Sequence, residues 1–374
     1  MSKKYVHIIS FDVPWPVDYG GVIDVYYQLK ALVQAGIKVH LHCFTYGRAQ
    51  AKELEQLCET VHFYPRNTGL LSNLSLTPYI IQSRKSNQLV QNLLKDHYPI
   101  VCQGMHSCAI LTDKRLAHRK IAYRAANVEH YYYQALYHKE QNTKKMLYYM
   151  LEALRLKKWE KNLSRADVIY TISLSDEAYY KKRFPNSKVI NLFGFFEDST
   201  FMMQEGRGDY VLYQGNLSVN ENIVAVEYLL SYIAREIELP LIIAGKNPTE
   251  QLKMQIAKTP NATLIENPSH DKMQELIQQA QINLLITFQP TGLKLKLLNA
   301  LYNGRFCVAN KEMLFGSGLE SLVELVNEDT EIIAKIKTLS KMEFRTEDIE
   351  KRKDFLSNIY STKERIALMI SNLF

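Results

Sequence analysis

The fold of this chain is decided by residues 288–310, FQPTGLKLKLLNALYNGRFCVAN. The order of residues predicts the end of a strand, a turn at the Pro-Thr-Gly triplet, a helix that ends at Gly304, and a short apolar strand. A helix start carries unpaired backbone N–H groups and the positive end of the helix dipole, and Gly292 lets a ligand approach the backbone closely. Because Lys294 and Lys296 add positive charge just inside the helix, we expect this start to bind an anion such as a diphosphate. An ordinary helix with two solvated lysines is the alternative.

Short apolar runs and helical apolar periods alternate on both sides of this stretch. Short runs predict strands, and apolar residues spaced three and four apart predict helices. The expected strands span residues 5–11, 39–44, 61–64, 100–103, 120–124, 167–172, 210–213, 240–244, 262–265 and 282–287. The expected helices span residues 22–35, 86–97, 143–164, 175–184, 222–234, 249–257 and 271–280.

Strict alternation of strands and helices indicates doubly wound parallel sheets with helices on both faces. Residues 191–200 have no clear period and contain Gly194, so we place a hinge there. The predicted fold class is therefore α/β with two Rossmann-like domains, whose ligands bind at the carboxyl ends of the strands. Capping boxes that begin at Ser317 and at Ser361 predict two further helices near the C-terminus.

The composition is that of an ordinary folded chain with an excess of positive charge. Its 374 residues are 47% hydrophobic and 23% charged, and this length predicts two domains. The net charge of +7 favours acidic partners such as a nucleotide, nucleic acid or an anionic membrane face. The five cysteines have no metal-type spacing and are expected to be reduced core residues of a cytosolic protein. The first apolar run is too short and polar for a signal peptide, and no run of about 20 apolar residues predicts a membrane span.

The helix within residues 288–310 carries a recognisable pattern. Lys296, Asn299, Ala300 and Gly304 fall on a lysine followed by A-x-x-x-G and an apolar strand. This pattern resembles the donor-binding helix of retaining GT-B glycosyltransferases of the family 4, or group 1, type. The chain looks like a divergent member of that family.

Two loops extend the resemblance. Pro16, Gly20 and Gly21 match the family's P-x-x-x-G-G loop after the first strand. Gly215 and Asn216 match the G-N-L form of the loop that opens the second domain. G-x-G-x-x-G is absent, so a dinucleotide fingerprint does not fit, and a plain turn is the alternative at each glycine.

The resemblance implies a GT-B fold with two Rossmann-like domains that face a cleft. The N-terminal acceptor domain would cover residues 1–195 and include a C-terminal crossover helix over residues 361–374, and the nucleotide-sugar donor domain would cover residues 196–360. The apolar stripe of the crossover helix, expected to pack on the first domain, comprises Ile366, Met369, Ile370 and Phe374.

The chain departs from the family where basic residues usually hold the diphosphate. Asn216 stands at the usual arginine, and Glu221 or Asn222 stands at the usual lysine. Lys246 and the lysines of the donor helix are expected to supply the charge instead, while a solvated loop lysine is the alternative for Lys246.

Two glutamates of the family's donor site are also replaced. Thr291 and Asn299 occupy their positions; the amide of Asn299 can both donate to and accept from ribose hydroxyls. The expected donor-binding residues are Gly20, Gly21, Gly215, Asn216, Lys246, Asn267, Thr291, Gly292, Leu293, Lys294, Lys296 and Asn299.

A catalytic segment is expected in the first domain. The run RAANVEH resembles the family's R-x-H-N-x-E, in which Asn127 and Glu129 match and Ala126 stands at the histidine. His130 is the nearest histidine, and His106 follows a neighbouring strand. Each histidine is a catalytic candidate, with a structural role as the alternative.

The resemblance implies a metal-independent, hexosyltransferase-like enzyme. It would move a sugar from a nucleotide-diphosphate sugar to a saccharide or lipid-linked acceptor in cell-surface polysaccharide or glycoconjugate biosynthesis. No D-x-D triplet or clustered ligand set predicts a metal site, and no cofactor or nucleic-acid partner is expected. Two alternatives stay open: a non-catalytic nucleotide-sugar-binding homologue, and a nucleotide-sugar epimerase of the same fold.

The predicted helix over residues 143–164 combines lysines and arginine with aromatic and aliphatic residues. Such a composition suits a helix at a membrane interface, so peripheral contact with an anionic membrane is among the expected partners. The protein would then work in the cytoplasm or at the inner face of the membrane. A solvated charged face above a buried apolar face is the alternative.

Overall fold

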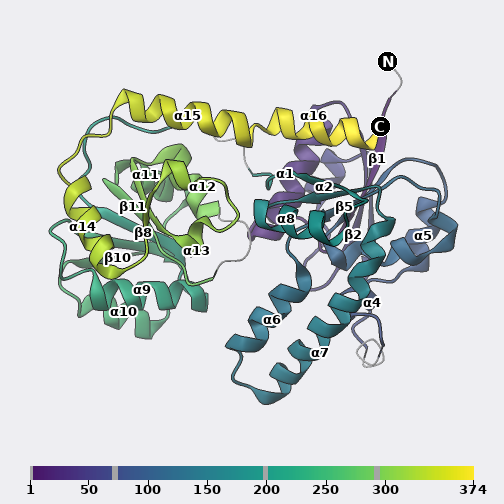
Figure 1. Ribbon diagram of the computed structural model, residues 1–374, viewed down its shortest axis with the longest axis horizontal. Coiled ribbons are helices and arrows are strands. Elements are labelled where there is room, and N and C mark those ends of the chain that lie inside the picture. The colour runs from purple at the N-terminus through teal and green to yellow at the C-terminus, as the bar shows by residue number, and fades with distance from the viewer. Residues whose placement is uncertain (1–2, 70–74, 197–200, 290–294) are drawn as a thin grey trace. The chain divides into compact units, whose positions relative to one another are not determined.

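The computed structural model describes residues 3–69, 75–196, 201–289 and 295–374. The chain forms two compact units, Met1–Glu197 with Ser361–Phe374, and Asp198–Tyr360. Figure 1 shows the elements of both units in chain order. The chain leaves the first unit within the expected hinge region and returns to that unit for its last helix.

The first unit is built on a seven-stranded sheet of order β3-β2-β1-β4-β5-β6-β7, in which every pair is parallel. Successive connections run outward in opposite directions from β1 and β4, so these strands form the switch point at which α/β sheets bind ligands. The strands are β1 (Tyr5–Ser10), β2 (Lys38–Thr45), β3 (Thr60–Pro65), β4 (Ile100–Gln103), β5 (Ile121–Ala125), β6 (Val168–Thr171) and β7 (Lys188–Asn191).

Helices cover both faces of this sheet, as a parallel sheet requires. One core joins the sheet to α1, α2 and α16; the other joins it to α4, α5, η1, α7, η3 and α8. The helices of the unit are α1 (Gly20–Gln34), α2 (Lys52–Leu57), α4 (Tyr79–Gln82), α5 (Asn87–Leu93), η1 (Met105–Thr112), η2 (Lys114–Leu116), α6 (Glu129–Lys139), α7 (Thr143–Trp159), η3 (Glu160–Arg165), α8 (Leu174–Arg183) and α16 (Thr362–Leu373).

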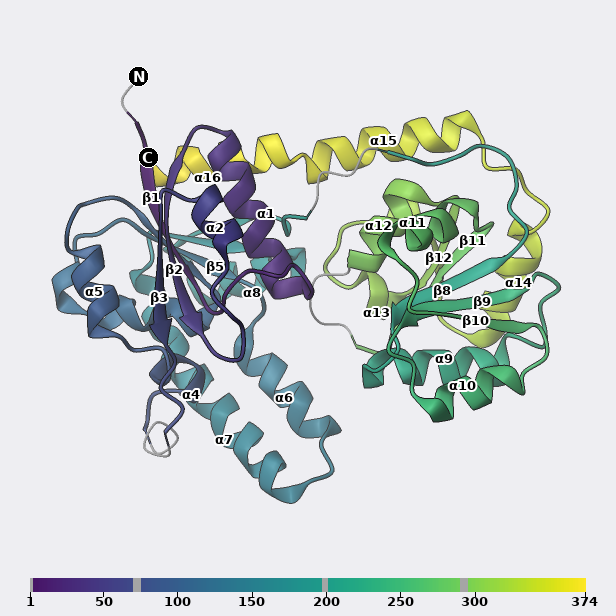
Figure 2. The same ribbon diagram turned by 180° about the vertical axis from the view of Figure 1, so that it is seen from behind.

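The second unit has a six-stranded parallel sheet of order β10-β9-β8-β11-β12-β13, with its switch point between β8 and β11. Helices α9, α10 and α14 pack on one face and α11 on the other, with α12 beside α11, as Figure 2 also shows. The elements are β8 (Val211–Asn216), α9 (Asn220–Tyr232), β9 (Leu241–Lys246), α10 (Glu250–Ala257), β10 (Ala262–Glu266), α11 (His270–Gln279), β11 (Ile282–Leu285), α12 (Leu295–Asn303), β12 (Phe306–Asn310), α13 (Lys311–Leu314), η4 (Glu320–Leu322), β13 (Glu324–Val326), α14 (Asp329–Leu339) and α15 (Thr346–Tyr360).

Helix α16 completes the core of the first unit. Ile366, Met369 and Leu373 are buried with residues of α1 and the sheet, and the Tyr170 hydroxyl donates to the Met369 carbonyl over 3.2 Å. Phe374, which was expected in the same stripe, is 46% exposed, and Leu373 is buried instead. The helix was therefore predicted correctly, with its buried stripe ending one residue earlier.

The two capping boxes have different outcomes. The Ser361 side chain accepts a hydrogen bond from the Glu364 N–H and begins α16, which confirms that prediction. The box at Ser317 was wrong, because Gly318 has a φ of +69° that no right-handed helix contains. Ser317 instead accepts from the Leu319 N–H, and only the 3₁₀ turn η4 follows.

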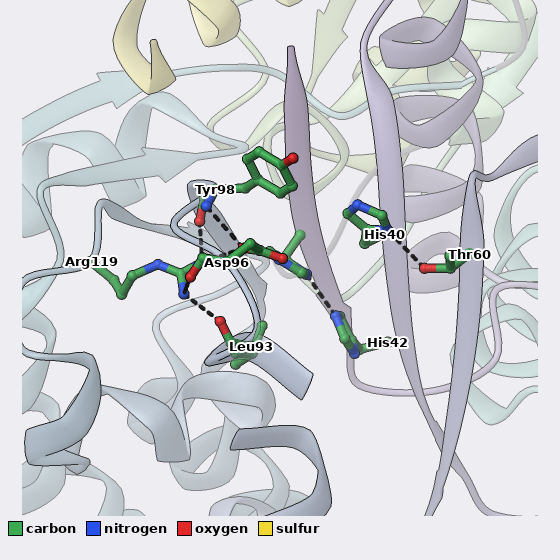
Figure 3. A network of polar contacts seen from close by, with 8 residues as sticks. His40, His42, Thr60, Leu93, Asp96, Tyr98 and Arg119 are labelled. Atoms are coloured by element: carbon green, nitrogen blue, oxygen red, sulfur yellow. Dashed lines mark hydrogen bonds and ion pairs between the residues drawn. The ribbon is translucent and has the colours of Figure 1, made fainter. Parts of the chain in front are cut away.

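A network of histidines lies on the α5 side of the first sheet (Figure 3). His7 Nδ1 is 2.9 Å from His42 Nε2, and His7 Nε2 is 3.0 Å from the Asp96 carboxylate. Tyr64 lies 2.8 Å from the other nitrogen of His42. Because Asp96 precedes β4, the network extends toward the amino ends of the strands, opposite the switch point.

Candidate functional site

The switch point of the first unit gathers three predicted residues. Gly20 and Gly21 begin α1, and a Cβ on Gly21 would lie 2.8 Å from the Phe11 ring. His106 follows β4 within η1, and its ring lies 5.5 Å from that of Phe11. Gly104, between β4 and η1, has a φ of +67° that favours glycine.

His106 and Glu129 are brought together beside this switch point. His106 Nδ1 is 3.9 Å from Glu129 Oε1, and the buried Nδ1 has no hydrogen-bond partner among the described residues. Glu129 is 2% exposed at the start of α6. Burial, with repulsion from Asp176, raises the pKa of Glu129 to about 7, although Arg84 opposes the rise. Burial, and then Arg84, holds the pKa of His106 well below 6.5, so the imidazole is neutral. A carboxyl that titrates near neutrality can take up or release a proton.

His130 has a different environment from His106. It is 1% exposed, and its Nδ1 lies 3.4 Å from Glu160 Oε1. Glu160 also accepts from the Tyr179 hydroxyl over 2.7 Å. This arrangement is that of a buried structural cluster. Asn127 is half-buried between β5 and α6.

The carboxyl ends of strands β8 and β9 pack closely in the second unit. A Cβ on Gly245 would lie 1.8 Å from the Gly215 carbonyl oxygen, and one on Gly215 would lie 2.9 Å from the Asn222 side chain. Gly245 is therefore required by its close approach to the backbone of the paired strand, whereas the space beside Gly215 is filled by the Asn222 side chain of α9. Asn216 is exposed at the end of β8, and its side chain accepts from the Ser218 N–H over 3.1 Å.

Lys296 is held at this edge of the second sheet. Its amino group donates to Asn222 Oδ1 over 2.9 Å and lies 3.4 Å from the Tyr213 hydroxyl, with the same ring 5.0 Å away. The Asn222 amide in turn donates to the Asn216 carbonyl over 2.9 Å. These contacts fix a cation where an anionic ligand of the switch point would bind.

A carboxylate faces the same switch point. The Thr287 hydroxyl, just after β11, donates to Glu221 at the start of α9. Glu221, one of the two residues that stand where the resemblance expects a lysine, thus places a carboxylate between the start of α9 and the segment after β11. Any diphosphate bound here would need Lys296 to offset that charge.

The remaining donor-site residues of the second unit are more dispersed. Lys246 is exposed at the end of β9. Asn267 Oδ1 accepts from the Asn247 N–H over 2.8 Å and shapes the neighbouring loop. Asn299 accepts from the Asn303 side chain over 2.6 Å within α12. The other predicted members, Thr291, Gly292, Leu293 and Lys294, lie outside the described residues.

Two buried polar contacts of the first unit were not predicted from the sequence. Arg84 is 6% exposed and donates from Nε to the Phe11 carbonyl over 2.8 Å beside His106; no motif marks it. Arg124 forms a buried bidentate ion pair with Asp24 of α1, both N–O distances being 2.8 Å. The sequence singles out Arg124 as the first residue of the RAANVEH run but does not predict its partner, and the only sign of that partner is that Asp24 interrupts the apolar face of its helix.

The structure also bears on metal binding and on membrane spans. Among the described residues, no group of three or more His, Cys, Asp or Glu side chains could hold a metal ion. Within the same part of the chain, no helix combines the length and apolar character needed to cross a bilayer. All five cysteines are free and buried, as the sequence predicts.

Solved structures match the chain from end to end. The crystal structure of Anabaena HepE in complex with UDP and glucose has a TM-score of 0.63 at 13% identity, covering 99% of this chain and 100% of that one. The crystal structure of TarM has a TM-score of 0.68 at 11% identity, with 100% and 99% covered. Together with two Rossmann-like units, these likenesses define the fold as GT-B.

Sequence comparisons add a family and a relative. Residues 208–341, within the second unit, match the family described as Glycosyl transferases group 1. A Klebsiella pneumoniae protein named "Uncharacterized 44.6 kDa protein in cps region" is 27% identical over 346 residues, 87% of this chain and 88% of the relative. Fold and family match together support a GT-B glycosyltransferase.

Proposed function

We propose that the protein is a retaining glycosyltransferase of the family 4 type. It transfers a sugar, of hexosyl type, from a nucleotide-diphosphate sugar to a saccharide or lipid-linked acceptor. The observation that carries the proposal is the position of Lys296. Its amino group is held by Asn222 at the switch point of the unit that matches Glycosyl transferases group 1.

The donor is assigned to the second unit. HepE, a structural neighbour, was crystallised with UDP and glucose. In this chain a diphosphate would contact Lys296 and Lys246, with Lys294 and the Gly292 helix start as further partners. Backbone approach at Gly215 and hydrogen bonding by Asn216, Asn267, Thr291 and Asn299 complete the proposed donor site.

The acceptor is assigned to the first unit, at the switch point of β1 and β4. The carboxylate of Glu129, with a pKa of about 7, is proposed to receive the proton of the acceptor hydroxyl as the leaving diphosphate departs, and the neutral His106 beside it is proposed to hydrogen-bond and orient that hydroxyl. Asn127 is proposed to hydrogen-bond the substrate. His130, which is paired with Glu160, is proposed to hold the neighbouring residues of the site in place.

Metal independence is the first prediction. Lysine amino groups are proposed to neutralise the leaving diphosphate, so turnover should be unchanged after EDTA treatment. The measurement is the rate of nucleotide release with and without chelator. Activity abolished by EDTA and restored by Mn²⁺ or Mg²⁺ would contradict it.

The biological role is proposed from the relative in a cps region. That relative supports a place in cell-surface polysaccharide or glycoconjugate biosynthesis. A lipid-linked acceptor would require the protein to work at a membrane surface, so the proposal includes peripheral contact with an anionic membrane.

A donor screen tests the proposed function. A true nucleotide sugar at about 100 times its Kd should add roughly 2.7 kcal/mol to the free energy of unfolding, and should then be hydrolysed slowly without acceptor. Stabilisation without hydrolysis or transfer would favour the inert binding homologue. Conversion of the sugar with the nucleotide still attached would favour the epimerase.

A further inference from the structure

Helix α7 exposes a continuous apolar stripe. Leu147 lies three and four residues before Met150 and Leu151, and Leu154 lies four and three residues after them, so all four share one helix face. Their side chains are 54%, 39%, 42% and 59% exposed. Figures 1 and 2 show α6 and α7 as a hairpin that extends from the first sheet.

The opposite face of α7 supplies the packing that holds the helix in place. Ala153, Leu156 and Trp159 are buried, and Leu156 and Trp159 belong to the core of the first unit. Glu152 is fully buried, where it accepts from the Tyr79 N–H over 2.7 Å and pairs with Arg155. The exposed stripe is thus a second apolar face that the fold does not use.

Lysines flank this stripe. Lys144 lies three residues before Leu147, and Lys157 and Lys158 lie three and four residues after Leu154, so all three border the same face. All three are exposed. Glu152, the one acidic residue of α7, is buried on the other side. The exposed face is therefore apolar at its centre and positive at its margins.

We propose that this face of α7 docks on an anionic lipid surface, with the helix lying in the interface and its lysines at the headgroup phosphates. A leucine centre with lysine margins matches a surface that is apolar within and negative at its boundary. A second copy of the chain fits less well, because a two-fold contact would bring the stripe against itself and place lysine near lysine. A single helix stripe also offers little of the area that a stable dimer buries.

This inference deepens the membrane part of the proposed function. Vesicle binding is measured without donor or acceptor, so its failure would leave glycosyl transfer to soluble acceptors untouched. Failure of glycosyl transfer would likewise not contradict the proposal that α7 docks on lipid.

The experiment is flotation of the purified full chain with phosphatidylcholine vesicles, with or without about one-third phosphatidylglycerol. The wild-type protein should float with the anionic vesicles, float less with the neutral ones, and be released by salt. The variant Lys157→Gln/Lys158→Gln should bind about 25-fold more weakly, at about fivefold per lysine. The variant Leu147→Gln/Leu154→Gln should lose about tenfold or more.

The matched control is Met254→Gln/Lys258→Gln, which changes an exposed methionine and lysine at α10 of the second unit. It should float as the wild type does. Every altered side chain is exposed, so circular dichroism should give wild-type spectra for all variants. Absence of wild-type binding to anionic vesicles, or wild-type binding by the leucine variant, would overturn the proposal. So would a dimer in light scattering that the leucine variant converts to monomer.

Discussion

Lys296 is the residue on which the proposed chemistry depends most, through its amino group. The sequence predicts its place near a helix start, which is that of α12 in the structure, because the residue falls on a recognisable pattern there. The sequence does not predict its partners, since Asn222 of α9 and Tyr213 of β8 lie 74 and 83 positions away and reach it only through the tertiary fold. The same limit applies to Arg124 and Asp24, whose pairing spans 100 positions.

Replacing Lys296 by alanine should weaken nucleotide-diphosphate binding. Loss of a charge-assisted hydrogen bond costs about 1.5–3 kcal/mol, which corresponds to a Kd roughly 10- to 150-fold higher. Lys294→Ala should act in the same direction, and both losses should be larger at low salt. Titration calorimetry with the nucleotide measures the effect, and Lys258→Ala, at an exposed lysine, is the control. If both single variants and the double variant bind as wild type does, the diphosphate site lies elsewhere.

His7 should make the fold sensitive to acid. Burial lowers its pKa from 6.5 to about 4, with His40 and Arg119 adding to the fall and Asp96 opposing it. As the pH drops below 6.5 the unfolded chain binds the proton first, so this contribution to the free energy of unfolding declines between about pH 6.5 and pH 4. At 1.36 kcal/mol per pH unit, the loss reaches about 3 kcal/mol.

Urea unfolding at pH 7.5 and pH 4.5 measures this effect, which should be smaller in His7→Gln. Glutamine can still donate to Asp96 but does not titrate. Glu129 and Asp176, whose pKa values are raised by burial to about 7 and about 6, act in the opposite direction and are common to both proteins. His97→Gln, at an exposed histidine, is the control; an unchanged pH dependence in His7→Gln would show that His7 does not govern acid stability.

At the level of elements, most strands and the longer helices of the expected set were predicted within a few residues, whereas β7, β13, α2, α14 and α15 were not predicted. Buried parallel strands are short apolar runs, and their bounds follow from the run itself. Helix α6 was missed because its sequence, EHYYYQALYHK, lacks a helical apolar period. The box at Ser317 failed because Gly318 adopts a left-handed φ, which a capping pattern cannot reveal.

Helix α16 gives a prediction at this scale. Met369 is fully buried against the first unit's core, whereas its neighbour Leu368 is 41% exposed. Met369→Ala should lower the free energy of unfolding by about 2–5 kcal/mol, and Leu368→Ala should change it by less than about 0.5 kcal/mol. Chemical denaturation of both variants provides the comparison. Equal effects would mean that α16 does not contribute this side chain to the core.

At the scale of the whole molecule, the chain returns to its first unit after building the second. Arg365 secures that return by donating to the Phe193 carbonyl over 3.1 Å, with its guanidinium 4.8 Å from the Phe195 ring. Arg365 thereby joins α16 to the segment that follows β7, close to the point where the chain first leaves the unit. The alternation of strands and helices predicts two Rossmann-like sheets, but no local pattern predicts the partners of Arg365, because they depend on tertiary packing.

Deleting residues 361–374 should abolish glycosyl transfer, while part of the nucleotide-sugar binding should be retained. The deletion removes Ile366, Met369 and Leu373 from the first unit's core, and several such losses of about 2–5 kcal/mol each rival the whole stability of a domain. The core of the second unit contains no residue of α16, so the site at Lys296 should keep its shape. Transfer assays, calorimetry with the nucleotide sugar and binding of a dye to exposed apolar surface measure the three consequences, with Leu368→Ala as the intact-helix control. Full activity after the deletion would mean that the proposed acceptor site of the first unit does not need this helix, and complete loss of nucleotide binding would mean that the two units do not fold separately.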